Sequence, residues 1–147
     1  GRGVKASSKP LCEGKPAPGT RIGHFWKLVR NRDQTRTIHT DVNYWKTFAM
    51  RRLEVPRGDA GALTLFKATP RQHQMFADQL TAEFPKEMED VATGNRGIEW
   101  STGVARDNHF FDCLVGCCVG ASVVGCSLTA QKPVQEKTRQ RKRVSYI

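Results

Sequence analysis

One carboxylate of this sequence stands among apolar neighbours and is the strongest candidate for chemistry. Asp112 follows Phe110 and Phe111 and precedes Cys113 and Leu114. An ionised carboxylate that leaves water is costly unless it is paired, hydrogen-bonded or bound to a cation. We therefore expect Asp112 to have a cationic partner. The alternative is an aspartate on the solvent-facing first turn of a helix, where it only complements the helix dipole.

Soft metal ligands stand near Asp112 at helical spacing. His109, Cys113 and Cys117 fall at positions i, i+4 and i+8. The i to i+8 separation of about 12 Å is too long for one zinc ion, so three ligands along one helix do not make a tetrahedral site. We expect the cysteines of this region to pack as free, small apolar side chains; they are Cys113, Cys117, Cys118 and Cys126.

Other catalytic patterns find little support in the sequence. The pair Glu83 and Glu87 is typical of a solvated face at the end of a helix rather than of an acid/base pair. No GxxxxGK[ST] phosphate loop, GxGxxG fingerprint or HExxH motif is present in these residues. ATP hydrolysis, dinucleotide binding and zincin chemistry therefore have no support here.

The segment that must position Asp112 is apolar nearly all round. Either Asp107 or Asn108 can cap a helix that continues through a run rich in Gly, Ala, Ser and Cys. Small side chains allow another backbone to approach closely, so we expect this to be the most buried helix, and Gly120→Leu to overpack it. A membrane span is the alternative, but the charge-free stretch from Cys113 to Leu128 is short for a bilayer.

Periodicity and turn residues predict the remaining elements. In chain order, they are a strand over Thr20–Val29 paired with Arg36–His39, a helix from Thr40 or Asp41 to Glu54, a buried strand over Ala62–Phe66, a helix from Pro70 that stops before Pro85, a loop over 86–97 and a short strand over Ile98–Trp100.

Composition limits the class of protein. The chain has 147 residues, of which 38% are hydrophobic, and a net charge of +10 that is concentrated at its two ends. We expect a linker over 1–19, one folded unit over 20–130 and a flexible tail over 131–147. The odd number of clustered cysteines favours a reducing cytoplasm. The sequence does not begin with Met, and we expect it to be a fragment.

The basic tail is a candidate nucleic-acid contact. Clustered cations attract polyanions by releasing their condensed counterions. The predicted DNA-binding residues are Lys137, Arg139, Arg141, Lys142 and Arg143. The alternative is a solvated tail that binds nothing in particular.

The order of several segments resembles the large terminase subunit of tailed phages, in its lambda-like family. The resemblance extends over about residues 20–128. It depends on Asp41–Lys46 leading into Arg52-Leu53, on Gly61–Phe66, on Gln79–Glu83, on Trp100 and on Asp107–Cys113 followed by a small-residue helix. The order of these segments carries the resemblance, since no single motif is decisive.

The resemblance implies an α/β fold, namely the C-terminal portion of an RNase H-like mixed sheet flanked by helices. It also implies an endodeoxyribonuclease with paired Mg²⁺ or Mn²⁺ ions. Asp112 matches the last acidic metal ligand, and the other ligands would lie before Gly1, so we expect the fragment alone to be inactive. Asp107 is a secondary catalytic candidate, and His109 is a candidate for orienting a water or the phosphate.

The partners that the resemblance implies are double-stranded DNA, the terminase small subunit and the portal or procapsid, in the cytoplasm of the host cell and without a membrane. A second interpretation stays open. The chain would then be a non-catalytic module whose basic ends hold DNA or dock on the portal. An acidic strand end upstream of Gly1 would favour the nuclease.

Overall fold

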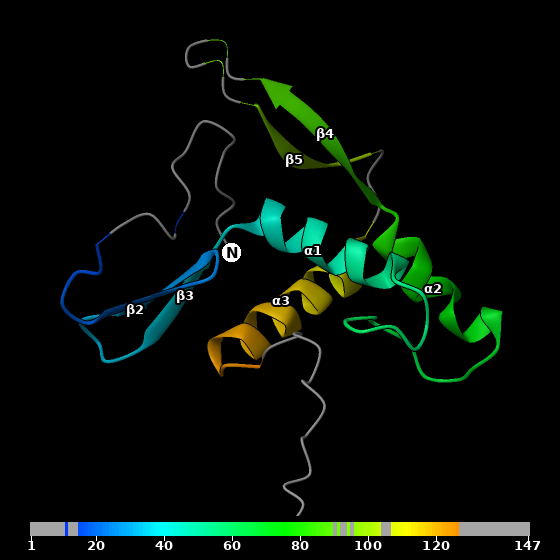
Figure 1. Cartoon of the computed structure of the whole chain (residues 1–147), viewed down its shortest axis with the longest axis horizontal. Coiled ribbons are helices and arrows are strands. Elements are labelled where there is room, and N and C mark those ends of the chain that lie inside the picture. The colour runs from blue at the N-terminus through cyan, green and yellow to red at the C-terminus, as the bar shows by residue number, and fades with distance from the viewer. Residues whose placement is uncertain are drawn as a thin grey trace, which may run out of the picture.

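Two small antiparallel sheets and three helices make up the part of the chain that the computed structural model describes (Figure 1). The described residues are 11, 15–89, 91, 94, 96–103 and 107–126. The elements are β1 (Thr20–Gly23), β2 (Trp26–Arg30), β3 (Arg36–Thr40), α1 (Val42–Glu54), α2 (Pro70–Leu80), β4 (Glu83–Glu89), β5 (Arg96–Thr102) and α3 (His109–Val123).

The first sheet has the order β1-β2-β3. The predicted single strand over Thr20–Val29 is wrong, because the chain turns at His24 and Phe25, where Phe25 has a φ of 54°. Gly23 pairs with Trp26, and a Cβ at Gly23 would lie 2.0 Å from the indole. The turn therefore needs glycine. The predicted pairing with Arg36–His39 is confirmed by β3.

Helix α1 agrees with the prediction at both ends. The Asp41 carboxylate accepts a hydrogen bond from the Tyr44 backbone N–H at 3.1 Å, so Asp41 is the N-cap. The helix ends at Glu54, two residues before Pro56. Trp45 and Ala49 are buried on the face that packs against α3.

The predicted strand over Ala62–Phe66 is wrong. Residues 62–66 are irregular, and the Phe66 side chain is 74% exposed. The Leu63 N–H donates to the Arg52 carbonyl at 2.8 Å, which ties the segment to the end of α1 instead of to a sheet. An apolar run of this kind becomes a strand only where a partner strand is available, and within the described residues none pairs with it.

Helix α2 begins at Pro70, as predicted, with a capping box between Thr69 and Gln72. It ends at Leu80, earlier than predicted, because the chain enters strand β4 at Glu83. The predicted loop over 86–97 is wrong at residues 86–89 and 96–97, which belong to the β4–β5 hairpin. The predicted strand over Ile98–Trp100 is confirmed within β5. A two-stranded ribbon tolerates Pro85, because each strand has one free edge.

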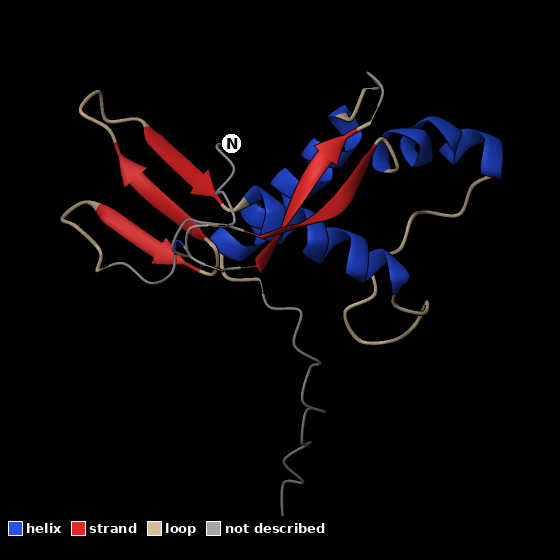
Figure 2. Ribbon diagram, turned by 90° about the horizontal axis from the view of Figure 1, so that it is seen from above, coloured by secondary structure: helices blue, strands red, loops and turns tan. Residues whose placement is uncertain are grey.

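The core lies between the helices and is built around α3. Figures 1 and 2 show α1 lying across α3, the β1–β3 sheet at one end of the pair and α2 at the other. Phe111, Val115 and Val119 of α3 are buried together with Trp26 and Trp45. At one end the Trp26 Nε1–H donates to Ser122 Oγ at 3.0 Å.

The expectation that α3 is the most buried helix is wrong, because two residues of α1 are exposed and seven residues of α3 are exposed. Only the row at Phe111, Val115 and Val119 is buried, and neighbouring rows are partly or fully exposed. A Cβ at Gly116 or Gly120 would meet nothing within 4 Å, so the expected overpacking by Gly120→Leu has no contact to act on. No helix in the described part of the chain is long and apolar enough to cross a bilayer.

The predicted mixture of helices and strands is confirmed. The described strands form two separate antiparallel sheets, and an RNase H-like mixed sheet stays a prediction. The basic tail over 131–147 and Cys12 lie outside the described residues.

Candidate active site

A buried lysine and a buried glutamate form the centre of the polar cluster. Lys46 comes from the second turn of α1, and Glu83 is the first residue of β4. Lys46 Nζ lies 2.6 Å from Glu83 Oε1 and 2.5 Å from Oε2, and the two side chains are 8% and 3% exposed. Each buried charge has lost its hydration, and the attraction and hydrogen bonds between the two groups compensate for this loss.

The N-terminus of α3 adds an amide and a second carboxylate. Asn108 is the N-cap residue, but its side chain makes no capping hydrogen bond and instead donates through Nδ2 to Glu83 Oε1 and, at 3.3 Å, to Asp112 Oδ2. Asp112 Oδ1 lies 3.3 Å from Lys46 Nζ. Lys46 and Asn108 thus each bridge both carboxylates, and we call Lys46, Glu83, Asn108 and Asp112 the charge cluster.

Asp112 has the partner that the sequence predicts, in the form of Lys46. Its expected burial is wrong, because its side chain is 55% exposed. The carboxylate lies on the first turn of α3, which was the alternative interpretation, but it is also held by two side chains. It therefore combines a fixed position with access from solvent.

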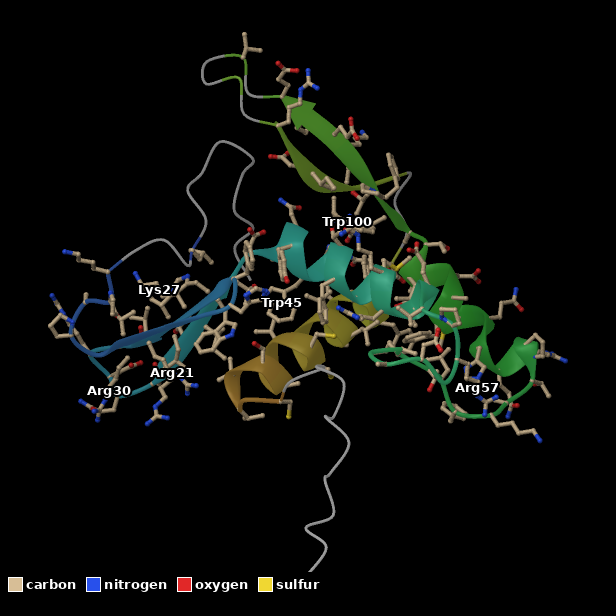
Figure 3. All side chains as sticks on the ribbon, in the orientation of Figure 1. Arg21, Lys27, Arg30, Trp45, Arg57 and Trp100 are labelled. Atoms are coloured by element: carbon tan, nitrogen blue, oxygen red, sulfur yellow. The ribbon has the colours of Figure 1, made fainter. Side chains whose placement is uncertain are left out.

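Aromatic side chains pack against the charge cluster on its buried side. Lys46 Nζ lies 5.4 Å from the centroid of the buried Phe111 ring, which contacts Trp100 at 5.2 Å between centroids. The Trp100 indole N–H donates to Thr47 Oγ1, and the Trp100 backbone N–H donates to Asn43 Oδ1, both at 3.0 Å. These bonds join β5 to α1, and Figure 3 shows Trp100 next to α1.

A cavity of about 560 Å³ opens beside Asp112. Lys46 and Asn43 line one part of it, and Ile38 and Thr40 of β3 line another. Along α3 the wall consists of Asp112, Gly116, Gly120 and their neighbours Val115 and Val119. Asp112 therefore faces a space large enough for part of a ligand.

The secondary candidates Asp107 and His109 lie next to the charge cluster in sequence but pair with each other. His109 Nε2 lies 3.7 Å from Asp107 Oδ1, and both side chains are more than three-quarters exposed. Asn108, and not Asp107, is the N-cap residue of α3. The catalytic roles of Asp107 and His109 stay predictions.

The cysteines differ from the predicted packing. Cys113, Cys117 and Cys126 are free and exposed, and only Cys118 is partly buried. Burial raises the pKa of the Cys118 thiol. The predicted apolar packing therefore holds for Cys118 alone.

The sequence pattern does not identify Lys46 or the side-chain contacts of Asn108 as parts of a site. It also places Glu83, which is buried, on a solvated face with Glu87. One signal was available for Lys46. It stands between Trp45 and Ala49, both on the apolar face of α1, where a lysine needs a partner. The partner itself lies 37 residues away in sequence, and no local pattern identifies it.

The charge cluster can supply only part of the ligand set of a metal ion. Lys46 Nζ contacts both oxygens of Glu83, so its ammonium already supplies a positive charge to this carboxylate. Asp112 makes only longer contacts and keeps acceptor capacity towards the cavity. Within the described residues no group of three or more His, Cys, Asp or Glu side chains is placed to hold a metal.

Comparison with known proteins gives one result. Residues 13–134 match the model of a family described as terminase large subunit gpA, endonuclease domain. No curated protein and no solved structure gives a significant match.

Proposed function

The chain belongs to the family of terminase large-subunit gpA endonuclease domains, and from this membership we propose that it takes part in metal-dependent cleavage of double-stranded DNA during viral DNA packaging. One observation carries the assignment of the site. Asp112 is a solvent-accessible carboxylate that two side chains hold at the edge of a cavity.

Asp112 would supply one ligand to Mg²⁺ or Mn²⁺, since hard cations of this kind prefer carboxylate oxygens. When bound, the metal would activate a water for attack on the phosphodiester and stabilise the leaving oxygen. Glu83 is already neutralised by Lys46, so the remaining ligands would come from outside the described residues. We therefore propose that the chain acts within a complete large subunit.

Lys46 and Asn108 would act as positioning residues. Lys46 Nζ contacts Asp112 Oδ1, and Asn108 Nδ2 donates to Asp112 Oδ2, so both oxygens are oriented before any ligand arrives. Glu83 holds Lys46 in turn. Such preorganisation lowers the cost of assembling a charged site at the moment of reaction.

The test is Asp112→Asn in the complete large subunit, assayed for nicking of double-stranded DNA with Mg²⁺ or Mn²⁺. Loss of a metal ligand should reduce cleavage by at least about 100-fold. DNA binding in EDTA should stay near the unsubstituted value, because binding depends on cationic side chains. The matched control is Asp78→Asn, an exposed aspartate of α2, which should leave cleavage unchanged.

Full cleavage by Asp112→Asn would contradict the assignment and favour the alternative, a non-catalytic module that binds DNA or docks on the portal. Circular dichroism separates loss of a ligand from loss of structure. Since Asp112 is half-exposed, the near-isosteric change should leave the spectrum unchanged.

The basic tail would add non-specific DNA affinity. In the test variant, Gln replaces the five basic residues, Lys137, Arg139, Arg141, Lys142 and Arg143. The slope of log K against log salt concentration is negative, and it should become shallower by about 0.9 for each phosphate that the tail no longer neutralises. An unchanged slope would mean that the tail is only a solvated end.

The terminase small subunit and the portal are further proposed partners, in the host cytoplasm.

A further inference from the structure

The sheet β1–β3 carries a large uncompensated positive charge. Residues 15–40 contain one acid, Asp33, and six basic residues, namely Lys15, Arg21, Lys27, Arg30, Arg32 and Arg36. Asp33 is engaged at the turn between β2 and β3, where Thr35 donates to it through its hydroxyl at 2.7 Å and its backbone N–H at 3.0 Å. These hydrogen bonds lower the pKa of Asp33. The single acid therefore serves the turn.

The strand register places three arginines on one face of the sheet. Arg30 pairs directly with Arg36 across β2 and β3, and Arg21 pairs with Leu28. Directly paired residues share a face, and alternate residues along a strand do so too. Arg21, Leu28, Arg30 and Arg36 thus project on the same face as Trp26, which packs against α3. We call this the arginine face.

Arg30 and Arg36 form a like-charge pair, which is destabilising in an isolated sheet. Within the described residues no carboxylate pairs with Arg21, Arg30 or Arg36. Arg30 donates to the neutral Gln34 side chain, and the Arg21 guanidinium lies 5.3 Å from the centroid of the Trp26 ring. All three arginines are exposed. A ligand that brings negative charge would relieve the repulsion.

The arginine face continues into the cavity beside Asp112. Ile38 and Thr40 belong to this face by register and line the cavity together with Asp112. On the opposite wall Asp112, Gly116 and Gly120 follow one another at four-residue spacing along α3. They span about 12 Å at 1.5 Å per residue. A Cβ at either glycine would meet nothing within 4 Å, so this wall is open.

We propose that the arginine face binds the phosphate backbone of double-stranded DNA and guides one strand along the open wall of α3 to Asp112. This inference rests on the proposed function, which makes DNA the substrate. Phosphates repeat along the duplex, and guanidinium groups match their geometry through paired hydrogen bonds. Two adjacent arginines without acidic partners fit a polyanion better than a single small anion.

The test measures binding of the 147-residue chain to a DNA duplex in EDTA over a range of salt concentrations. The variant is Arg30→Gln/Arg36→Gln. The matched control is Arg57→Gln/Arg71→Gln, which removes the same charge from exposed positions in the loop after α1 and in α2, with Arg57 far from the sheet (Figure 3). With two phosphates no longer neutralised, the slope of log K against log salt concentration should become shallower by about 2 in the variant. The control should keep the original slope.

Equal slopes for the variant and the control would overturn the proposal. Loss of binding to anionic phospholipid vesicles without a change in DNA binding would overturn it in favour of a membrane surface. The thermal midpoint of Arg30→Gln/Arg36→Gln should be unchanged or higher, because a like-charge pair is removed. EDTA prevents metal-dependent cleavage during the binding measurement. A negative result for the arginine face is therefore independent of the role of Asp112, which the nicking assay tests.

Discussion

The charge cluster and the arginine face differ in whether their charges are paired with opposite charges. In the charge cluster, Lys46 contacts both Glu83 and Asp112, and Asn108 bridges the same two carboxylates. On the arginine face, Arg30 lies opposite Arg36 with no acid between them. Charges that are paired inside the molecule fix geometry, whereas charges left unpaired at the surface are available to a partner. The cavity beside Asp112 connects the two regions.

Removing the cation of the charge cluster should disturb this contrast most severely. Lys46→Met leaves Glu83 buried without an opposite charge, which should lower the free energy of unfolding by about 3–5 kcal/mol. Urea denaturation followed by tryptophan fluorescence measures this change. The double variant Lys46→Met/Glu83→Gln should recover part of the stability, because no unpaired charge then stays buried.

The control for this prediction is an ion pair at the surface. Arg96 Nε lies 3.2 Å from Glu89 Oε2 in the β4–β5 hairpin, with side chains 81% and 55% exposed. Arg96→Met should cost about 0–1 kcal/mol, because water screens the pair. If Lys46→Met is no more destabilising than Arg96→Met, the buried pair does not fix the site.

The two regions also differ in how far the sequence predicts them. The helices come from local signals, namely Asp41 as N-cap, Pro56 beyond the end of α1 and Pro70 at the first position of α2. The β2–β3 hairpin likewise follows from the polar turn after Arg30. These signals act within a few residues, so one sequence is sufficient to recognise them.

The charge cluster could not be predicted in the same way. It joins Lys46, Glu83 and Asn108, which are separated by 37 and 25 residues. The packing of α1 against α3 and of the β4–β5 hairpin against α1 brings them together. Glu83 also begins a strand that its neighbours Pro85 and Lys86 disfavour by local preference. The hairpin forms because β5 supplies a partner over its whole length. Asp112 could be identified, because a lone acid among apolar residues is a local signal.

The smallest change that we predict concerns the open wall of α3 between the two regions. Gly120 lies inside the helix and lines the cavity, and an added Cβ would meet nothing within 4 Å. Alanine avoids the entropic cost that glycine carries in a helix, so Gly120→Ala should raise the free energy of unfolding by about 0.5–1 kcal/mol. Urea denaturation measures this change.

Gly61→Ala is the opposite control. Gly61 has a φ of 82°, and its Cβ would lie 2.6 Å from Arg52 Nη1, so the same substitution should destabilise the chain there. Loss of stability in Gly120→Ala would mean that another segment already covers this wall in the free protein. A gain would mean that the wall is open before any ligand binds, and that α3 gives up helix stability at Gly120 to keep a smooth surface between the arginine face and Asp112.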